Sequence, residues 1–258
     1  MIQLAIEVAL EAGEFLKKSV GKIQHIEQKY GQERNLVTEI DRESEQIIIR
    51  RIKKRYPDHD FLAEESGSHE KKSDYRWVID PLDGTLNFMH GMPIFCVSIG
   101  LEVKGEPVLG VVYDPNLNEL FTAEQGKGAF LNKKPIRVSS TSTLIESMLV
   151  TGFPYTIREN PDNAVQHFVN FLMEAQAVRR LGSAALDICY VAAGRFDGFW
   201  EVSLSPWDVT AGFVIVREAG GTYTDFHGHP STISTKRVLV SNGLIHEAMV
   251  EVLRRGLP

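Results

Sequence analysis

Apolar residues recur at helical spacing in two N-terminal stretches, residues 2–20 and 40–56. Each stretch therefore predicts an amphipathic helix with one apolar face. Thr38 precedes the second stretch and is placed to cap that helix, while Pro57 ends it. Asp41 then falls in the first turn, where the helix dipole favours a carboxylate.

Between residues 61 and 138 the apolar positions change to short runs rich in β-branched and aromatic residues. A turn at 104–106 separates two of these runs and predicts a β-hairpin. Further runs extend the hairpin as a meander, and a short buried strand is expected at 77–79 ahead of it. The meander strands that the pattern predicts are 95–103, 108–113, 119–123 and 128–131.

After residue 149, apolar stretches of helical period alternate with short strand-like runs. An antiparallel α+β half, residues 1–145, is therefore followed by a smaller α/β half, residues 146–258. The sequence between them contains no repeat, low-complexity tract or linker, which predicts one compact unit with a ligand site between the halves. The expected helices lie near 160–175, 183–193, 207–218 and 244–255, and the expected strands are 177–180, 198–202, 221–225 and 238–241.

Composition narrows the class of protein. The 258 residues include 28 Lys and Arg against 34 Asp and Glu, a net charge of −6, so the basic surplus typical of nucleic-acid binders is missing. No apolar run approaches the ~20 residues of a membrane span, and acids such as Glu7 interrupt the N-terminus, which is unlike a signal peptide. Cys96 and Cys189 are too few for a disulfide framework and predict buried thiols in a soluble, cytoplasmic protein.

The strongest candidate for chemistry is a pair of acids, Asp80 and Asp83, three positions apart. Pro81 and Gly84 predict a tight turn there, which crowds the two carboxylates together at a strand end. Their repulsion is costly unless a cation lies between them, and hard oxygen ligands suit Mg²⁺. The Gly84 and Thr85 amides favour phosphate binding. Taken alone, the segment is also explained as a structural turn.

Three further segments carry acids at helix or strand ends. Glu64 and Glu65 follow a short apolar strand at 61–63, as acids do in many solvated loops. Asp208 opens an apolar helix, and the preference of helix starts for Asp explains it. Asp41 is explained in the same way. Each of these segments, by itself, therefore has a structural explanation.

Together, these four segments resemble the signatures of the inositol monophosphatase family, in the same order and with similar spacing. That family belongs to the lithium-sensitive, Mg²⁺-dependent sugar phosphatases. The resemblance runs from about residue 7 to residue 251, and its most specific part is the pair of segments 77–87 and 207–221. The stretch 180–201 is most similar to the bacterial branch. The resemblance implies a layered αβαβα sandwich.

The resemblance also implies a site for two to three Mg²⁺ ions, with Li⁺ as an inhibitor. It assigns the first ion to Glu64, Asp80 and the backbone carbonyl of Leu82. The second ion would be held by Asp80, Asp83 and Asp208. A third, looser ion would share Glu64 and otherwise be held mainly by water. At these positions the chain shows no departure from the family.

For catalysis, the resemblance implies direct in-line attack by a metal-activated water, without a phosphoenzyme. Glu64 and the Thr85 hydroxyl, itself paired with Asp41, would position and deprotonate that water. The amides of Gly84 and Thr85 would hold the phosphate group. A water near Asp208 would protonate the leaving alkoxide.

Substrate contacts follow from the same resemblance. Glu201 matches an acid that hydrogen-bonds polyol hydroxyls, although by its own sequence context it is only an acid at a strand end. Ala184 matches a backbone contact to the polyol ring. Asp83 would serve both metal and substrate, and Asp208 would also lie beside the substrate. Glu65 matches a residue behind the metal ligands and is a less secure ligand than its neighbour.

Other polar residues fit this chemistry less well. The eight histidines show no zinc-type spacing, and residues 227–229 predict a polar turn. Arg179 and Arg180 would meet either a phosphate or a surface or subunit contact. Ser66 and Ser183 have no histidine partner that the sequence identifies, which disfavours a serine-nucleophile hydrolase.

Two alternative functions are open at this point. A haloacid-dehalogenase-like phosphatase would carry Asp-x-Asp, whereas two residues separate Asp80 from Asp83 here, and Asp208 would be unexplained. Bacterial relatives in the resembled family also act through protein partners in transcription and ribosomal RNA maturation. The alternative of another class is therefore that the chain is a regulatory protein-binding module.

The substrate is open as well. Relatives hydrolyse inositol monophosphates, fructose 1,6-bisphosphate or 3′-phosphoadenosine 5′-phosphate, and some tolerate a broad range of sugar phosphates. The stretch 180–201 favours inositol monophosphate. The resemblance further implies a homodimer acting on a small phosphate monoester, with no membrane partner and no direct nucleic-acid binding.

Overall fold

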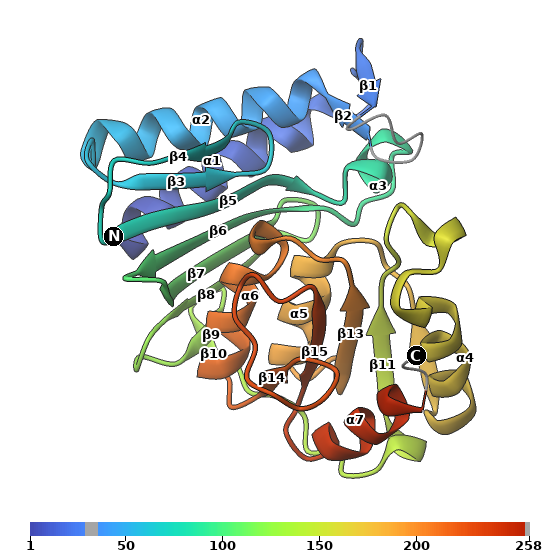
Figure 1. Cartoon of the computed structure of the whole chain (residues 1–258). Coiled ribbons are helices and arrows are strands. Elements are labelled where there is room, and N and C mark those ends of the chain that lie inside the picture. Colours follow the sequence, from blue (N-terminus) through green and yellow to red (C-terminus); the bar gives the residue numbers. More distant parts are fainter. Residues whose placement is uncertain (29–35, 256–258) are drawn as a thin grey trace.

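Residues 1–28 and 36–255 are described by the computed structural model of this chain. Within them, helices flank and separate two β-sheets (Figure 1). The layers follow the order helix, sheet, helix, sheet, helix, which confirms the expected αβαβα sandwich. In addition to these two sheets, β1 (Ile26–Gln28) and β2 (Leu36–Thr38) form a separate antiparallel pair before the second helix.

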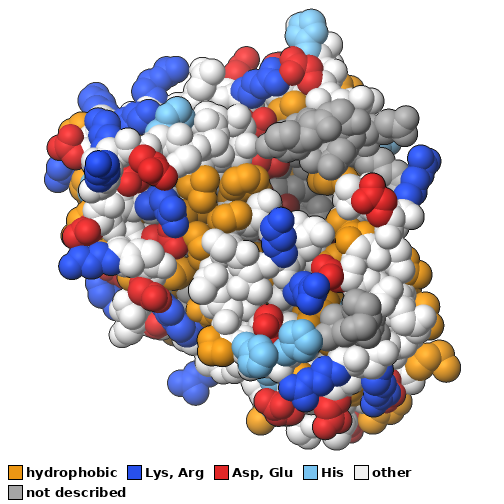
Figure 2. Space-filling model, viewed as in Figure 1, with side chains coloured by type: hydrophobic (Ala, Val, Ile, Leu, Met, Phe, Trp, Pro, Cys, Tyr) orange, Lys and Arg blue, Asp and Glu red, His pale blue; other side chains and the backbone are white. Residues whose placement is uncertain are grey.

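The first helical layer consists of α1 (Ile2–Ser19) and α2 (Glu39–Arg55), as the apolar spacing predicts. Thr38 caps α2 as expected: its Oγ1 accepts a hydrogen bond from the Ile40 amide at 3.2 Å, and its amide donates to Asp41 Oδ2 at 2.8 Å. Acids at the start and bases at the end of α2 both complement the helix dipole. Figure 2 shows basic side chains gathered over the end of α2, where the last turn contains Lys53, Lys54 and Arg55.

The large sheet has eight strands in the order β10-β9-β8-β7-β6-β5-β3-β4. Its meander from β6 to β9 is antiparallel as predicted, but β3 and β5 pair in parallel. The reason is that β4 folds back along the outer side of β3, so the chain crosses to the inner side before entering β5. The strands are β3 (Asp60–Ala63), β4 (Gly67–His69), β5 (Tyr75–Asp83), β6 (Cys96–Val103), β7 (Glu106–Asp114), β8 (Glu119–Glu124), β9 (Ala129–Leu131) and β10 (Lys134–Pro135).

The small sheet has five strands in the order β12-β11-β13-β15-β14. Its pairs are parallel on both sides of β11 and antiparallel on both sides of β15, so the sheet is mixed. Four of these strands were predicted and β11 was not. The strands are β11 (Met148–Thr151), β12 (Ala177–Arg179), β13 (Gly198–Val202), β14 (Thr222–Thr224) and β15 (Arg237–Ser241).

Two helices cover the outer face of the small sheet and two fill the space between the sheets (Figure 1). All four lie where helical periodicity predicts them. The helix expected near 160–175 begins only at Ala164, because two 3₁₀ turns, Ile157–Glu159 and Pro161–Asn163, precede it. The outer helices are α4 (Ala164–Glu174) and α7 (His246–Arg254), and the inner ones are α5 (Ala184–Ala192) and α6 (Pro206–Glu218).

The inner helix α6 lies directly on β6 and β7 because two glycines face it. A Cβ atom at Gly110 would lie 2.3 Å from the Ala211 carbonyl oxygen, and one at Gly100 would lie 2.4 Å from Thr210 Cγ2. Apolar side chains of both halves, such as Phe121 of the large sheet, belong to the core around α5 and α6. The two halves therefore share one hydrophobic core.

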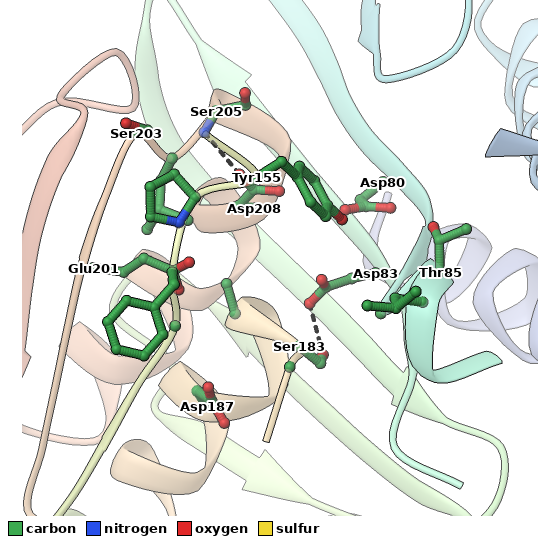
Figure 3. A pocket seen from close by; sticks show the side chains of 18 of the residues that line it. Asp80, Asp83, Thr85, Tyr155, Ser183, Asp187, Glu201, Ser203, Ser205 and Asp208 are labelled. Carbon is green, nitrogen blue, oxygen red and sulfur yellow. Dashed lines mark hydrogen bonds between the residues drawn. The ribbon is translucent and has the colours of Figure 1, made fainter. Parts of the chain in front are cut away.

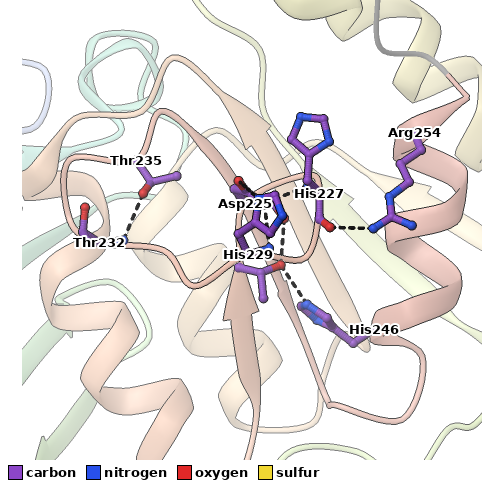
Figure 4. A network of polar contacts seen from close by, with 8 residues as sticks. Asp225, His227, His229, Thr232, Thr235, His246 and Arg254 are labelled. Atoms are coloured by element: carbon purple, nitrogen blue, oxygen red, sulfur yellow. Dashed lines mark hydrogen bonds and ion pairs between the residues drawn. The ribbon is translucent and has the colours of Figure 1, made fainter.

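A polar network joins the last helix to the small sheet (Figure 4). The His246 ring is buried between the hydroxyls of Thr224, at 2.9 Å, and Ser241, at 2.8 Å. Asp225 Oδ1 accepts hydrogen bonds from the amides of His227 and His229, which confirms the predicted polar turn. These histidines therefore serve local structure at a distance from the acidic segments.

Both cysteines are free and buried, as expected. In the described residues, no helix is long and apolar enough to cross a membrane.

Replacing Gly110 by Ala should destabilise the fold by about 3 kcal/mol, because the added methyl group collides with backbone of α6 that cannot move aside. Gly105→Ala is the matched control. Gly105 has φ +84° and open space around it, so only the backbone conformation is strained, at about 1 kcal/mol. Urea unfolding of both variants measures the difference. Equal losses of unfolding free energy in the two variants would show that the close approach of α6 does not require glycine at position 110.

Candidate active site

A cleft of about 290 Å³ lies between the two halves, as expected, and is lined by residues of both. Figure 3 shows Asp80, Asp83 and Thr85 on the side of the large sheet, with Glu201 and Asp208 across the cleft from them. All the expected acidic ligands line this cleft, and so do the other expected contacts except Asp41. The expected residues that line it are Glu64, Asp80, Leu82, Asp83, Gly84, Thr85, Ala184, Glu201 and Asp208.

Glu64 and Asp80 become neighbours because β3 and β5 are parallel. Ala63 pairs with Ile79, and each acid is the next residue in its segment. The Glu64 amide donates a hydrogen bond to the Ile79 carbonyl oxygen at 3.2 Å. Asp80 is 2% exposed. Burial, followed by the charges of Glu64, Asp83 and Asp208, raises the pKa of Asp80 well above its ordinary value.

The predicted tight turn at Asp80–Asp83 is wrong, because β5 continues to Asp83. Asp80 pairs with Ser98 and Asp83 with Cys96, so three residue steps on β5 face two on β6. This is a β-bulge, and it reverses the alternation of side chains at that point. Residues three apart on a regular strand face opposite sides. The bulge therefore turns both carboxylates to the same side.

Asp83 is tied across the cleft to the start of α5. Its Oδ2 accepts hydrogen bonds from the Ser183 hydroxyl at 2.6 Å and from the Ala185 amide at 2.8 Å. Burial raises the pKa of Asp83 to about 6, although these hydrogen bonds lower it. Ser183 therefore supports an acid, a role that its sequence context does not indicate.

Thr85 begins the short helix α3 (Thr85–Met89), after Gly84 reverses the chain with φ +94°. The Thr85 Oγ1 atom lies 2.9 Å from Asp41 Oδ1 and 3.1 Å from the Leu82 carbonyl oxygen. The side-chain pairing of Thr85 with Asp41 agrees with the expectation. Asp41 is fully buried, and burial is the main reason why its pKa is raised.

Asp208 has two roles at the start of α6. Its Oδ2 accepts a hydrogen bond from the Ser205 amide at 2.7 Å, which completes a capping box. The capping explanation is therefore correct for one of its oxygens. Its carboxylate also lines the cleft, where burial and then the charges of Asp83 and Glu64 raise its pKa well above the ordinary value.

Glu201 lies in β13, on the opposite wall from Asp80. A Cβ atom on Gly152 would lie 2.2 Å from Glu201 Oε2, so the glycine leaves room for this carboxyl group. Burial raises the pKa of Glu201 to about 8, the charge of Arg180 lowers it, and that of Asp83 raises it. Glu201 thus combines a half-buried position with a strongly shifted pKa.

The donor set of the cleft fits Mg²⁺. It consists of carboxylate oxygens and the Leu82 carbonyl, and hard oxygen donors are what this ion prefers. The like charges raise one another's pKa, a cost that a bound cation relieves. In the part of the chain that the structure describes, no three acidic, histidine or cysteine side chains form a preformed cage. Mg²⁺ usually binds through one or two carboxylates with waters and substrate phosphates, so a cage is not required.

Several lining residues were missed in the sequence. The loop after the unpredicted strand β11 contributes Gly152 and Tyr155, and α5 contributes Asp187. Glu45 of α2, which does not itself line the cleft, was also missed: its two carboxylate oxygens accept hydrogen bonds from the amides of Glu65 and Ser66, at 2.8 and 2.9 Å. This anchors the turn after Glu64. For Gly152, Asp187 and Glu45 the only signal in the sequence was a glycine or an acid in or beside an apolar run, and for Tyr155 there was none.

Comparison with known proteins gives a consistent result. A family model described as the inositol monophosphatase family matches residues 1–257. An inositol-1-monophosphatase of Synechocystis sp. is 47% identical over 253 residues, covering 98% of this chain and 88% of that protein. Nus factor SuhB of Pasteurella multocida is 45% identical over 242 residues, covering 93% and 91%. The solved structure of an inositol monophosphatase from Anabaena (Nostoc) has a TM-score of 0.90 at 44% identity, covering 100% of this chain and 96% of that one.

Ser183→Ala should raise the pKa of Asp83 above its value of about 6, because the charged carboxylate loses a short hydrogen bond. It should also destabilise the fold by about 1 kcal/mol, because Ser183 caps α5. An NMR titration of the carboxyl carbons in metal-free protein measures the pKa. Ser142→Ala, at an exposed position, is the control. An unchanged Asp83 titration would contradict the assigned hydrogen bond.

Proposed function

The chain belongs to the inositol monophosphatase family, whose members are phosphatases, and from this premise we propose that it is a Mg²⁺-dependent phosphomonoesterase hydrolysing inositol monophosphate to inositol and phosphate. The observation that carries the proposal is the convergence of acids from three separate segments on one cleft. The relative from Synechocystis is named for inositol-1-phosphate hydrolysis. The converging acids are Glu64, Asp80, Asp83 and Asp208.

We assign the metal ligands as follows. Glu64, Asp80 and the Leu82 carbonyl would hold one ion, and Asp80, Asp83 and Asp208 a second. A third ion would share Glu64. When bound, Mg²⁺ neutralises the phosphate charge and lowers the pKa of a coordinated water so that hydroxide is available near neutral pH.

The attacking water would be placed by Glu64 and Thr85. The Thr85 hydroxyl has one proton, and both Asp41 Oδ1 and the Leu82 carbonyl lie within hydrogen-bonding distance to accept it. Its oxygen is therefore left as an acceptor for the water. Glu64, at the end of β3, would take the proton as general base. The Gly84 and Thr85 amides would hold the phosphate oxygens.

The alcohol would lie on the opposite wall. Glu201 would accept hydrogen bonds from polyol hydroxyls, and the Ala184 backbone would contact the ring. Asp83, between the two walls, would touch both metal and substrate. A water beside Asp208 would return a proton to the leaving oxygen. The attack and the departure would thus occur on opposite sides of the phosphorus, as in-line displacement requires.

Within the same chemistry, the alternative is fructose-1,6-bisphosphatase or broad sugar-phosphate phosphatase activity. Steady-state rates of phosphate release from inositol 1-phosphate, fructose 1,6-bisphosphate and 3′-phosphoadenosine 5′-phosphate distinguish these activities. A regulatory, protein-binding role in transcription is the alternative of another class, favoured by the relative named Nus factor SuhB. We further propose that the protein is a cytoplasmic homodimer and that Li⁺ inhibits it.

Glu64→Gln should lower Mg²⁺-dependent phosphate release from inositol 1-phosphate by at least about a hundredfold, because it removes both a metal ligand and the general base. Glu70→Gln, at an exposed site one strand away, is the matched control and should leave the rate unchanged. Phosphate release with and without Mg²⁺ measures both. An inert wild type, or a Glu64→Gln variant as active as wild type, sinks the catalytic proposal and leaves the regulatory one.

Mg²⁺ should stabilise the protein more at pH 7.5 than at pH 5. The Asp83 pKa of about 6 lies above the ordinary value of about 3.9. The stability that its protonated form contributes is therefore present at low pH and lost as pH rises through about 6. Mg²⁺ binds the charged form and offsets that loss. Thermal melts with and without Mg²⁺ at both pH values measure the shift, and Asp83→Asn should weaken its pH dependence without removing it, because Asp80 and Asp208 also have raised pKa values. A pH-independent shift would count against these ligands.

A further inference from the structure

Asp187 is a buried carboxyl group without a partner. It is 1% exposed, and neither of its carboxylate oxygens has a hydrogen-bond partner in the described structure. Asp187 is not needed to cap α5, because the Ser183 hydroxyl accepts a hydrogen bond from the Leu186 amide at the start of that helix. Burying a carboxyl group without partners is costly, so a fold rarely keeps one for structural reasons alone. A ligand that completes its hydrogen bonds would explain it.

The position of Asp187 indicates which part of a ligand it would meet. It lines the same cleft as the metal-binding acids. Figure 3 places it on α5, on the side of Glu201 and away from Asp80 and Thr85. The phosphate group would lie at Asp80 and Thr85. Asp187 therefore faces the region left for the alcohol part of a phosphate ester.

The surroundings of Asp187 suit hydroxyl groups. Burial raises its pKa well above the ordinary value, the charges of Glu201 and Asp83 raise it further, and that of Arg180 lowers it. A neutral carboxyl group offers one O–H donor and one C=O acceptor. An alcohol hydroxyl is also both donor and acceptor, so the two groups match. Arg180 lines the cleft and supplies further donors.

We propose that Asp187 is a specificity-determining residue that hydrogen-bonds a hydroxyl group of the leaving alcohol, beside Glu201, so that the cleft selects phosphate esters of polyols. The proposal rests on the proposed phosphatase function. An ester whose alcohol lacks further hydroxyls leaves Asp187 unpaired and gains nothing from it. The residue thereby contributes to substrate choice rather than to cleavage of the phosphate bond.

The test compares two esters and two variants. Asp187→Leu removes both hydrogen-bonding atoms at similar volume, and Asp187→Asn keeps a donor and an acceptor. For Asp187→Leu, kcat/KM should fall roughly tenfold or more with inositol 1-phosphate but stay within about a factor of two with p-nitrophenyl phosphate. Asp187→Asn should retain most of the activity with both. Removal of an unpaired buried carboxyl should also leave Asp187→Leu at least as heat-stable as wild type.

Asp114→Asn is the matched control, because Asp114 is fully buried in β7 away from the cleft and accepts the Asn116 and Leu117 amides. It should lose stability without a change in substrate preference. An equal loss on both esters with a lower melting temperature in Asp187→Leu would show a structural role and overturn the proposal. Unchanged kinetics on both esters would overturn it as well. A wild type that cleaves neither ester with Mg²⁺ refutes the phosphatase function itself, and the assignment of Asp187 with it.

Discussion

Repulsion between buried carboxylates is the constraint around which this cleft is built. Burial and mutual charge raise the pKa values of Asp80, Asp83 and Asp208 together. Such a cluster would move apart if its members were not individually anchored, and each accepts at least one hydrogen bond from the fold. Those donors are the amides of Leu82, Ala185 and Ser205 and the hydroxyl of Ser183. The anchors come from three different elements, so the cluster forms only when both halves are assembled.

Two irregularities of the large sheet place the acids. Parallel pairing of β3 with β5 puts Glu64 beside Asp80. The bulge in β5 then turns Asp83 to the same side as Asp80. A wholly antiparallel, regular sheet would have separated these groups. Bulges are often found next to active sites because they redirect side chains in this way.

The shared core explains how the opposite wall is fixed. Close packing of α6 on Gly100 and Gly110 leaves little freedom for the helix that carries Asp208. In the same layer, α5 carries Ala184 and Asp187 toward the cleft. Unpartnered or mutually repelling acids in this wall reduce stability, and the large core around α5 and α6 offsets that cost. The apolar core behind the cleft thus stabilises the fold, whereas the acids that line the cleft destabilise it.

The sequence by itself determined the helices, the meander and the order of the acidic segments, because periodicity, capping and turn residues are local properties. Thr38, for example, caps α2 as predicted. Strand β4 was missed because its residues, Gly67–His69, are all polar or glycine and show no alternation, and β11 was missed as well. Only the tertiary structure decided that β3 and β5 are parallel, that β5 is bulged rather than turned, and that Asp187 has no partner. These features depend on which strand lies beside which and on what fills the space between them, and long-range pairing leaves no trace in local sequence.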